Sequence, residues 1–172
     1  MKILVIGSGG REHAIVWKLS QSKKVEKIFC APGNGGIKEN AELVDIKADD
    51  VPRLLDFAKN NKIDLTVVGP EAALVKGIVD VFNENDLKAF GPFRETAMLE
   101  GSKAFSKSVM EKFGLPTAGF KVFDNPEAAK KYLNKIGVPI VIKADGLASG
   151  KGVIMPKTIE EGERAIDSIM VS

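Results

Sequence analysis

Short apolar, β-branched runs alternate with amphipathic segments from Lys2 to Gly91, and this rhythm constrains the fold more than any other feature. The apolar runs, which read as strands, cover residues 2–7, 27–31, 42–46, 63–69 and 87–91. The amphipathic segments, which read as helices, cover residues 11–22, 51–61 and 71–85. Strands that are apolar along their whole length and separated by helices are typical of a parallel sheet covered on both faces. We therefore predict an α/β, Rossmann-like parallel-sheet domain that binds ligands at the carboxyl ends of its strands.

The pattern changes after Pro92. Ser102 is a candidate N-cap for a helix that begins near Lys103, and Gly114 followed by Pro116 predicts its end. Beyond this helix we predict strands at 117–123, 138–144 and 153–156 and helices at 125–136 and 158–170. The sequence thus predicts a first domain at 1–100, a helical linker at 101–118 and a second α/β unit at 119–172.

Composition limits the classes of partner. The chain has 172 residues, with 25 Lys and Arg against 23 Asp and Glu and no basic run, which argues against a nucleic-acid binder. No N-terminal apolar stretch fits a secretory signal or a membrane span, and the lone Cys30 excludes an internal disulfide. We expect a cytoplasmic monomer that binds small molecules and neither nucleic acid nor membrane.

The first strand runs directly into a glycine turn, Gly7 to Gly10, and then a helix. Backbone amides converge at such a turn and favour an anion, above all a phosphate group. The glycines could instead only permit a tight turn, an alternative that a lone G-x-G leaves open. A dinucleotide site, as in an oxidoreductase, is disfavoured because Glu12 replaces the third glycine and the second strand ends at Cys30 and Ala31 without an acid.

Two more turns rich in glycine and proline belong to the same predicted sheet edge, "APGNGG" at 31–36 and "GPEAAL" at 69–74. Pro70 suits the first helical position, and Glu71 could simply compensate the helix dipole, which is the commoner role of an acid there. Three such turns at one edge nevertheless favour a pocket.

The second unit contains "VIKADGLASGKGVIM", which places Lys143 at a strand end and a glycine-rich loop before Lys151. The spacing is not that of a P-loop, because three residues separate Gly146 from Gly150 and Gly152 stands where a magnesium-binding hydroxyl is needed. A strand, loop and strand form a hairpin flap that can close over a polyphosphate. The alternative is a mobile surface hairpin with a solvated lysine.

Three other residues receive simple interpretations. We expect Trp17 in the core beside Ala14 and Ile15, and Cys30 as a small buried residue. His13 is expected to serve in helix packing or in a hydrogen bond to a ligand, since the sequence places no partner that would make it a base.

Five segments, in order and at the expected separations, resemble the phosphoribosylamine–glycine ligase (glycinamide ribonucleotide synthetase) family of purine biosynthesis: "GSGGREHA", "APGNGG", "VGPEAAL", "LEGSKAFSK" and "VIKADGLASGKGV". The last two are similar to the ATP-grasp superfamily. The resemblance implies a pre-ATP-grasp domain followed by the opening portion of an ATP-grasp domain. It also implies ATP and magnesium (or manganese), and ligation of glycine to 5-phosphoribosylamine through a glycyl phosphate.

The resemblance also implies site residues. Those for the phosphorylated sugar amine are Gly9, Gly10, Arg11, Glu12, Pro32, Gly33, Asn34, Gly69, Pro70 and Glu71. Those for ATP are Lys103, Lys143, Asp145, Gly146, Ser149, Gly150, Lys151 and Gly152. No catalytic residue is assigned, and no metal ligand is expected in this chain, because the superfamily carries its magnesium ligands downstream of the flap. The alternatives are a non-catalytic nucleotide- or phosphate-binding module and another ATP-grasp carboxylate–amine ligase.

Overall fold

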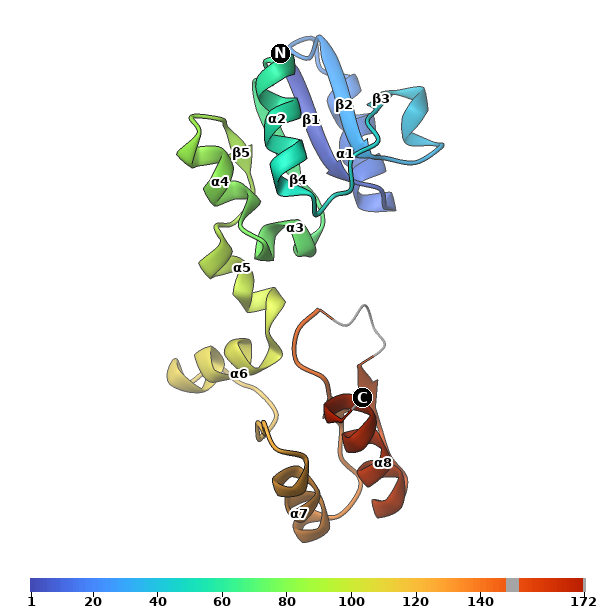
Figure 1. Ribbon diagram of the computed structural model, residues 1–172, viewed down its shortest axis with the longest axis vertical. Helices are drawn as coiled ribbons and strands as arrows, with labels where there is room; N and C mark the ends of the chain where they lie inside the picture. Colours follow the sequence, from blue (N-terminus) through green and yellow to red (C-terminus); the bar gives the residue numbers. More distant parts are fainter. Residues whose placement is uncertain (148–151, 172) are drawn as a thin grey trace. The chain divides into compact units, whose positions relative to one another are not determined.

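The computed structural model describes residues 1–147 and 152–171. The chain forms two compact units, Met1–Gly101 and Ser102–Ser172, which are coloured from blue to yellow-green and from yellow to red in Figure 1. Within the described residues, no helix is both long and apolar enough to cross a membrane.

The first unit is built on a five-stranded sheet in the order β3-β2-β1-β4-β5. All four neighbouring pairs are parallel, which confirms the predicted fold class. The strands are β1 (Lys2–Gly7), β2 (Lys27–Pro32), β3 (Glu42–Leu43), β4 (Leu65–Val68) and β5 (Ala89–Phe90).

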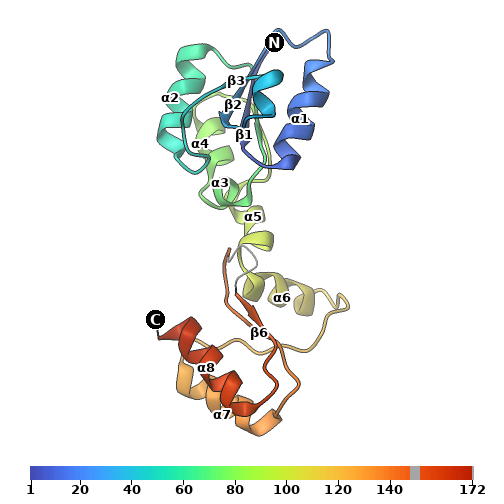
Figure 2. The ribbon, with the colours of Figure 1, turned by 90° about the vertical axis from the view of Figure 1, so that its right-hand side faces the viewer.

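Helices cover both faces of this sheet. Helix α1 (Gly10–Ser20) lies on one face, and α2 (Val51–Asn61) and α4 (Ile78–Glu84) lie on the other, as Figure 2 shows. The remaining helical elements are η1 (Ile37–Glu39), α3 (Glu71–Val75) and α5 (Arg94–Gly101). Because β1 is covered on both sides, its residues 3–6 are apolar at successive positions rather than at alternate ones.

The core of the first unit accordingly has two layers. Val5 of β1 packs with Val16 of α1 on one face of the sheet. Leu4, the next residue along the strand, packs with Leu54 of α2 on the other face. All four side chains are fully buried, so β1 is the centre of the unit.

Some sequence expectations for the first unit are wrong. The helix predicted at 71–85 is divided into α3 and α4 at Gly77, whose φ of +82° is left-handed and interrupts helical geometry. Helix α5 was not predicted. Trp17 is 55% exposed, because α1 faces the sheet through Val16 and Glu12 instead.

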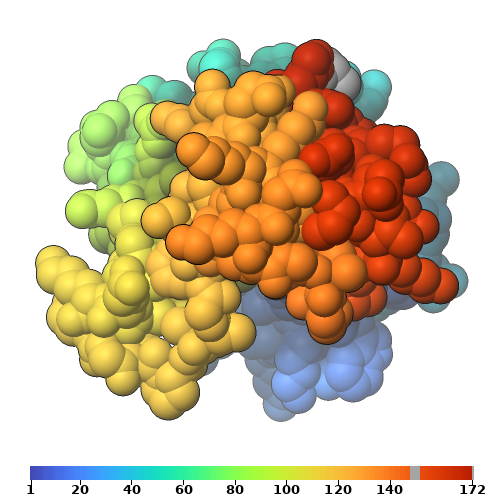
Figure 3. Space-filling model, turned by 90° about the horizontal axis from the view of Figure 1, so that it is seen from below, coloured from blue at the N-terminus to red at the C-terminus, as the bar shows by residue number. Residues whose placement is uncertain are grey.

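In the second unit, α7 and α8 pack side by side, in orange and red in Figure 3. Their buried residues Ala129, Leu133 and Ile166 form a small core, and Ile142 packs against it. The elements are α6 (Lys103–Lys112), α7 (Pro126–Ile136), β6 (Ile142–Lys143), β7 (Val153–Ile154) and α8 (Ile159–Met170). Strands β6 and β7 form an antiparallel pair, as expected for a hairpin.

The strand predicted at 117–123 is wrong. This segment is irregular, and Val122 is 56% exposed. A strand requires a neighbour that accepts and donates backbone hydrogen bonds, and none of the described strands pairs with this segment. Instead, Lys107 of α6 holds it, since the ammonium donates to Thr117 Oγ1 at 2.6 Å and to the Ala118 carbonyl at 3.0 Å.

Candidate functional site

A cavity of about 260 Å³ lies at the carboxyl edge of the first sheet. It is lined by the turn and helix start after β1, residues 9–12, and by Pro70 and Glu71 after β4. Strand order reverses at β1, with β2 on one side and β4 on the other. Crevices at such a reversal are the usual ligand sites of open parallel sheets.

Arg11 joins the two turns across this cavity. Its guanidinium donates to the Gly69 carbonyl at 2.7 Å and to Glu71 Oε1 at 3.0 Å. A hydrogen bond from its own backbone amide and the Arg11 guanidinium hold the pKa of Glu71 below its ordinary value. The Arg11 side chain is 61% exposed, so this ion pair orients groups in the site more than it stabilises the fold.

Glu12 lies beneath the glycine turn and is only 5% exposed. Its carboxylate accepts a hydrogen bond from the Gly9 amide at 2.6 Å. A Cβ at Gly7 would stand 2.5 Å from Glu12 Cγ, and one at Gly69 would overlap the Glu12 carboxylate. Glycine is therefore required at both strand ends by the packing of Glu12.

This arrangement changes which amides can hold an anion. The Gly9 amide is already bound to Glu12. Helix α1 begins at Gly10, and the first amides of a helix have no acceptor within it. A phosphate at this turn would therefore contact the amides of Gly10 and Arg11.

The turn after β2 lies next to the first turn on the same edge. Gly33 donates its amide to the Gly7 carbonyl at 3.0 Å. Asn34 Nδ2 donates to the Ser8 carbonyl at 2.8 Å, and Asn34 Oδ1 accepts from the amides of Gly36 and Ile37. The side-chain groups of Asn34 thus fix the loop after β2. The cavity between the other two turns is not lined by Pro32, Gly33 or Asn34, although all three belong to the predicted site.

The second unit has its own groove, of about 930 Å³, which involves α6, the 117–123 segment, α7, β6 and α8. Lys103, Lys143 and Asp145 all line it, so three residues predicted for ATP share one groove. Ser149, Gly150 and Lys151 lie outside the described residues. Gly152 closes the base of the hairpin, since its carbonyl accepts from the Ala144 amide at 2.8 Å.

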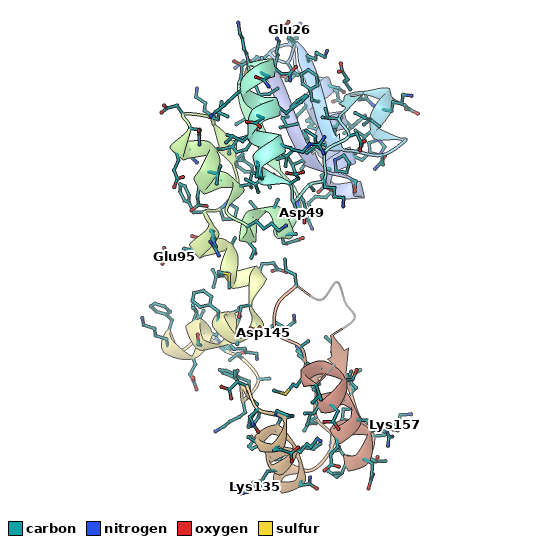
Figure 4. All side chains as sticks on the ribbon, in the orientation of Figure 1. Glu26, Asp49, Glu95, Lys135, Asp145 and Lys157 are labelled. Atoms are coloured by element: carbon teal, nitrogen blue, oxygen red, sulfur yellow. The ribbon has the colours of Figure 1, made fainter. Side chains whose placement is uncertain are left out.

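Hydrogen bonds connect the loop after β6 to the start of α6. Lys103 Nζ donates to the Gly146 carbonyl at 2.7 Å. Asp145, which is labelled in Figure 4, accepts from Ser102 Oγ at 2.9 Å and from the Ala104 amide at 3.1 Å. Partial burial alone would raise the pKa of Asp145, but the hydrogen bonds, led by that of the Ala104 amide, outweigh it and lower the pKa below its ordinary value.

The acids of the described residues do not gather into a metal centre. No three of the histidine, cysteine, aspartate and glutamate side chains in residues 1–147 and 152–171 lie together as metal ligands would. The Arg11 guanidinium, the ammonium groups of Lys103 and Lys143 and the backbone amides are groups in these two sites that can bind a phosphate.

Two family profiles match the chain. The profile described as "Phosphoribosylglycinamide synthetase, N domain" matches residues 1–100. The profile described as "Phosphoribosylglycinamide synthetase, ATP-grasp (A) domain" matches residues 101–172. The chain belongs to the phosphoribosylglycinamide synthetase family. The expected family is thereby confirmed.

Curated relatives of the family are closely similar in sequence. The phosphoribosylamine–glycine ligase of Escherichia coli K12 is 55% identical over 172 residues, which is 99% of this chain and 40% of that protein. That of Caldanaerobacter subterraneus is 54% identical over 170 residues, or 99% of this chain and 41% of that protein. The chain therefore spans about two fifths of the length of the family members that it matches.

Solved structures have the same fold. The phosphoribosylamine–glycine ligase of Thermotoga maritima has a TM-score of 0.74 at 32% identity, covering 95% of this chain and 38% of its own. A biotin carboxylase of Campylobacter jejuni, in complex with β,γ-ATP, has a TM-score of 0.77 at 21% identity, covering 98% of this chain and 41% of its own. The latter likeness concerns the fold alone.

Proposed function

We propose that this chain is the part of a phosphoribosylamine–glycine ligase that holds the sugar amine and begins the ATP site. The complete enzyme would join glycine to 5-phosphoribosylamine, with ATP, to give glycinamide ribonucleotide, ADP and phosphate through a glycyl phosphate. The observation that carries the proposal is the cavity between the turns after β1 and β4, in a chain 55% identical to a ligase of that name.

In the first unit, the cavity suits a phosphorylated sugar amine. The amides of Gly10 and Arg11 at the start of α1 favour the phosphate. The carboxylate of Glu71 can only accept hydrogen bonds, so it suits the hydroxyl groups or the amine of the sugar. Arg11 orients Glu71 while its remaining N–H groups stay available to the phosphate. We propose Gly9, Glu12, Gly69 and Asn34 as residues that shape this site from behind.

In the second unit, the two lysines suit the phosphates of ATP. Lys103 and Lys143 line one groove, and ammonium groups gathered there gain from a polyanion between them. ATP would supply the phosphoryl group that activates the glycine carboxylate. The described residues hold no cluster of acids that would bind magnesium.

Two alternatives receive less support. A dinucleotide oxidoreductase lacks support because Glu12 stands at the position of the third glycine in the dinucleotide-binding motif. The Glu12 carboxylate accepts a hydrogen bond from the Gly9 amide of the same turn. Another carboxylate–amine ligase of the ATP-grasp superfamily would have a groove like that of the second unit. It would not account for the match of residues 1–100 to the phosphoribosylglycinamide synthetase N domain. The cytoplasmic location, the monomeric state, the absence of nucleic-acid and membrane partners and the choice between magnesium and manganese remain predictions.

The test is the substrate dependence of ADP release by the complete enzyme. We expect release only when ATP, magnesium, glycine and freshly generated phosphoribosylamine are all present, with glycinamide ribonucleotide identified by mass spectrometry. ADP release that follows bicarbonate or another carboxylate in place of glycine would contradict the proposal and favour a different ligase.

A further inference from the structure

The carboxylate of Asp145 is bound to the first turn of α6 on both sides of Lys103. Ser102 Oγ donates to it at 2.9 Å, and the Ala104 amide donates at 3.1 Å. Ser102 and Ala104 are the residues directly before and after Lys103. The backbone position of Lys103 is therefore fixed by one side chain from the loop that follows β6.

The ammonium of Lys103 is directed to the same loop. Lys103 Nζ donates to the carbonyl of Gly146, the residue after Asp145, at 2.7 Å. Gly146 has a φ of +84°, a conformation that favours glycine, although nothing lies within 4 Å of the position of a Cβ there. Its conformation, and not a lack of space, accounts for glycine at this position.

The start of α6 has little remaining capacity for an anion of its own. The amide of Ala104 is bound to Asp145, and the amide of Phe105 is bound to Ser102 Oγ at 3.0 Å. A negative carboxylate also already occupies the positive end of the helix. A nucleotide phosphate in this groove must then be bound by the lysine side chain and not by the helix amides.

We infer that Asp145 is a positioning residue for Lys103: it holds the first turn of α6 so that the Lys103 ammonium points into the groove where the Gly146 carbonyl now accepts it. The inference rests on the proposed function, in which Lys103 binds ATP. Asp145 itself contacts no nucleotide in this account, which distinguishes it from the ATP contact that the family resemblance implies. When a phosphate arrives, the Lys103 ammonium exchanges its carbonyl acceptor for a charged one.

The experiment compares two substitutions in the second unit of the complete enzyme, each of which removes a side-chain oxygen that accepts from an amide in the first turn of a helix. Asp145→Ala removes the acceptor at α6, and Asn125→Ala removes the acceptor of the Ala128 amide at the start of α7. Titration calorimetry gives the MgADP dissociation constant, steady-state kinetics give kcat and the KM for ATP, and thermal melting reports stability.

We expect Asp145→Ala to weaken MgADP binding about tenfold, with a matching rise in the KM for ATP and a smaller change in kcat, because a misplaced charge-assisted contact is lost. Asn125→Ala should lower the melting temperature comparably and leave the MgADP affinity unchanged. Asp145→Asn keeps the shape but is a weaker, neutral acceptor, and we expect a loss of about threefold.

Unchanged MgADP affinity in Asp145→Ala, or a loss no greater than that of Asn125→Ala, would overturn the inference. If Asp145→Ala fails to fold, wild-type affinity in Asp145→Asn would overturn it equally. MgADP binding that depends on Asp145, in an enzyme that makes no glycinamide ribonucleotide, would support the inference and contradict the proposed function. Absence of MgADP binding in the wild-type enzyme would contradict both.

Discussion

At the scale of single residues, Glu12 explains the glycines around it. The side chain fills the space beside Gly7 and Gly69 and binds the Gly9 amide. The family resemblance implies a ligand-binding role for Glu12, which lines the cavity, but nothing in the sequence motif indicates its packing against the glycines. Its burial depends on the approach of β4 to β1, a contact between residues far apart in the sequence that local patterns do not encode.

Gly69→Ala tests this packing directly. The added Cβ would overlap the buried Glu12 carboxylate, and we expect a loss of about 1–3 kcal/mol in the free energy of unfolding, measured by urea denaturation followed by circular dichroism. Gly10→Ala is the control, since nothing lies within 4 Å of its Cβ position. Equal stability of Gly69→Ala and the wild type would show that Glu12 does not occupy this space.

Gly10→Val tests the anion-binding amides. The position has room for a side chain, so the fold should persist, but a branched side chain should shield the amides at the start of α1. We expect loss of measurable ribose 5-phosphate binding in a calorimetric titration. Gly35→Val, which also has open space, should bind like the wild type. Wild-type affinity in Gly10→Val would remove the phosphate from this turn.

At the scale of elements, the sequence predicts well where local signals agree with tertiary contacts. The strands β1, β2 and β4 and the helices α1, α2, α7 and α8 match continuous apolar runs or clear caps, such as Asn125 for α7. The predicted strand at 117–123 has the right residue types but no partner strand in the described part of the chain. Pairing of strands is a long-range property, so composition alone could not decide it.

The sequence predicts which turns lie together in the candidate sites, but not the long-range contacts of individual side chains. Turns at strand ends share one edge in any parallel sheet, so the approach of Gly9 and Glu71 follows from topology. The contacts of Asp145 with Ser102 and Ala104 could not be predicted from the sequence. Asp145 follows these residues in the chain by 43 and 41 positions, and only the folded structure brings the loop to the start of the helix.

Gly77→Ala tests the division between α3 and α4. Because Gly77 has a φ of +82°, alanine there should be strained and should lower the free energy of unfolding by about 1 kcal/mol. Chemical denaturation of the wild type and of Gly77→Ala measures this difference in the free energy of unfolding. A stability gain would instead indicate the continuous helix at 71–85 that the sequence pattern predicts.

At the scale of the whole molecule, each of the two units has its own candidate site for the proposed reaction, a cavity in the first and a groove in the second. In the proposed function, the helix amides and Arg11 of the first unit bind a sugar phosphate, and Lys103 and Lys143 in the groove of the second unit bind a polyphosphate. Neither supplies, among its described residues, a cluster of acids that would hold the metal of phosphoryl transfer.

The 172-residue chain assayed by itself should therefore bind ligands without completing the reaction. We expect no ADP release that depends on both glycine and phosphoribosylamine in the presence of ATP and magnesium, while ribose 5-phosphate still binds. The complete enzyme serves as the positive control. Release that requires both substrates would show that residues 1–172 contain a sufficient metal site.

In the proposed function, the cavity between the turns after β1 and β4 holds the phosphorylated sugar amine. The most direct test of this assignment is the KM for phosphoribosylamine of the complete enzyme carrying Glu71→Gln, which removes the charge that pairs with Arg11 and leaves the second unit unchanged. We predict a rise of about tenfold or more in this KM, with the KM for ATP unchanged. An unchanged KM for phosphoribosylamine, or an equal rise in both constants, would contradict the account.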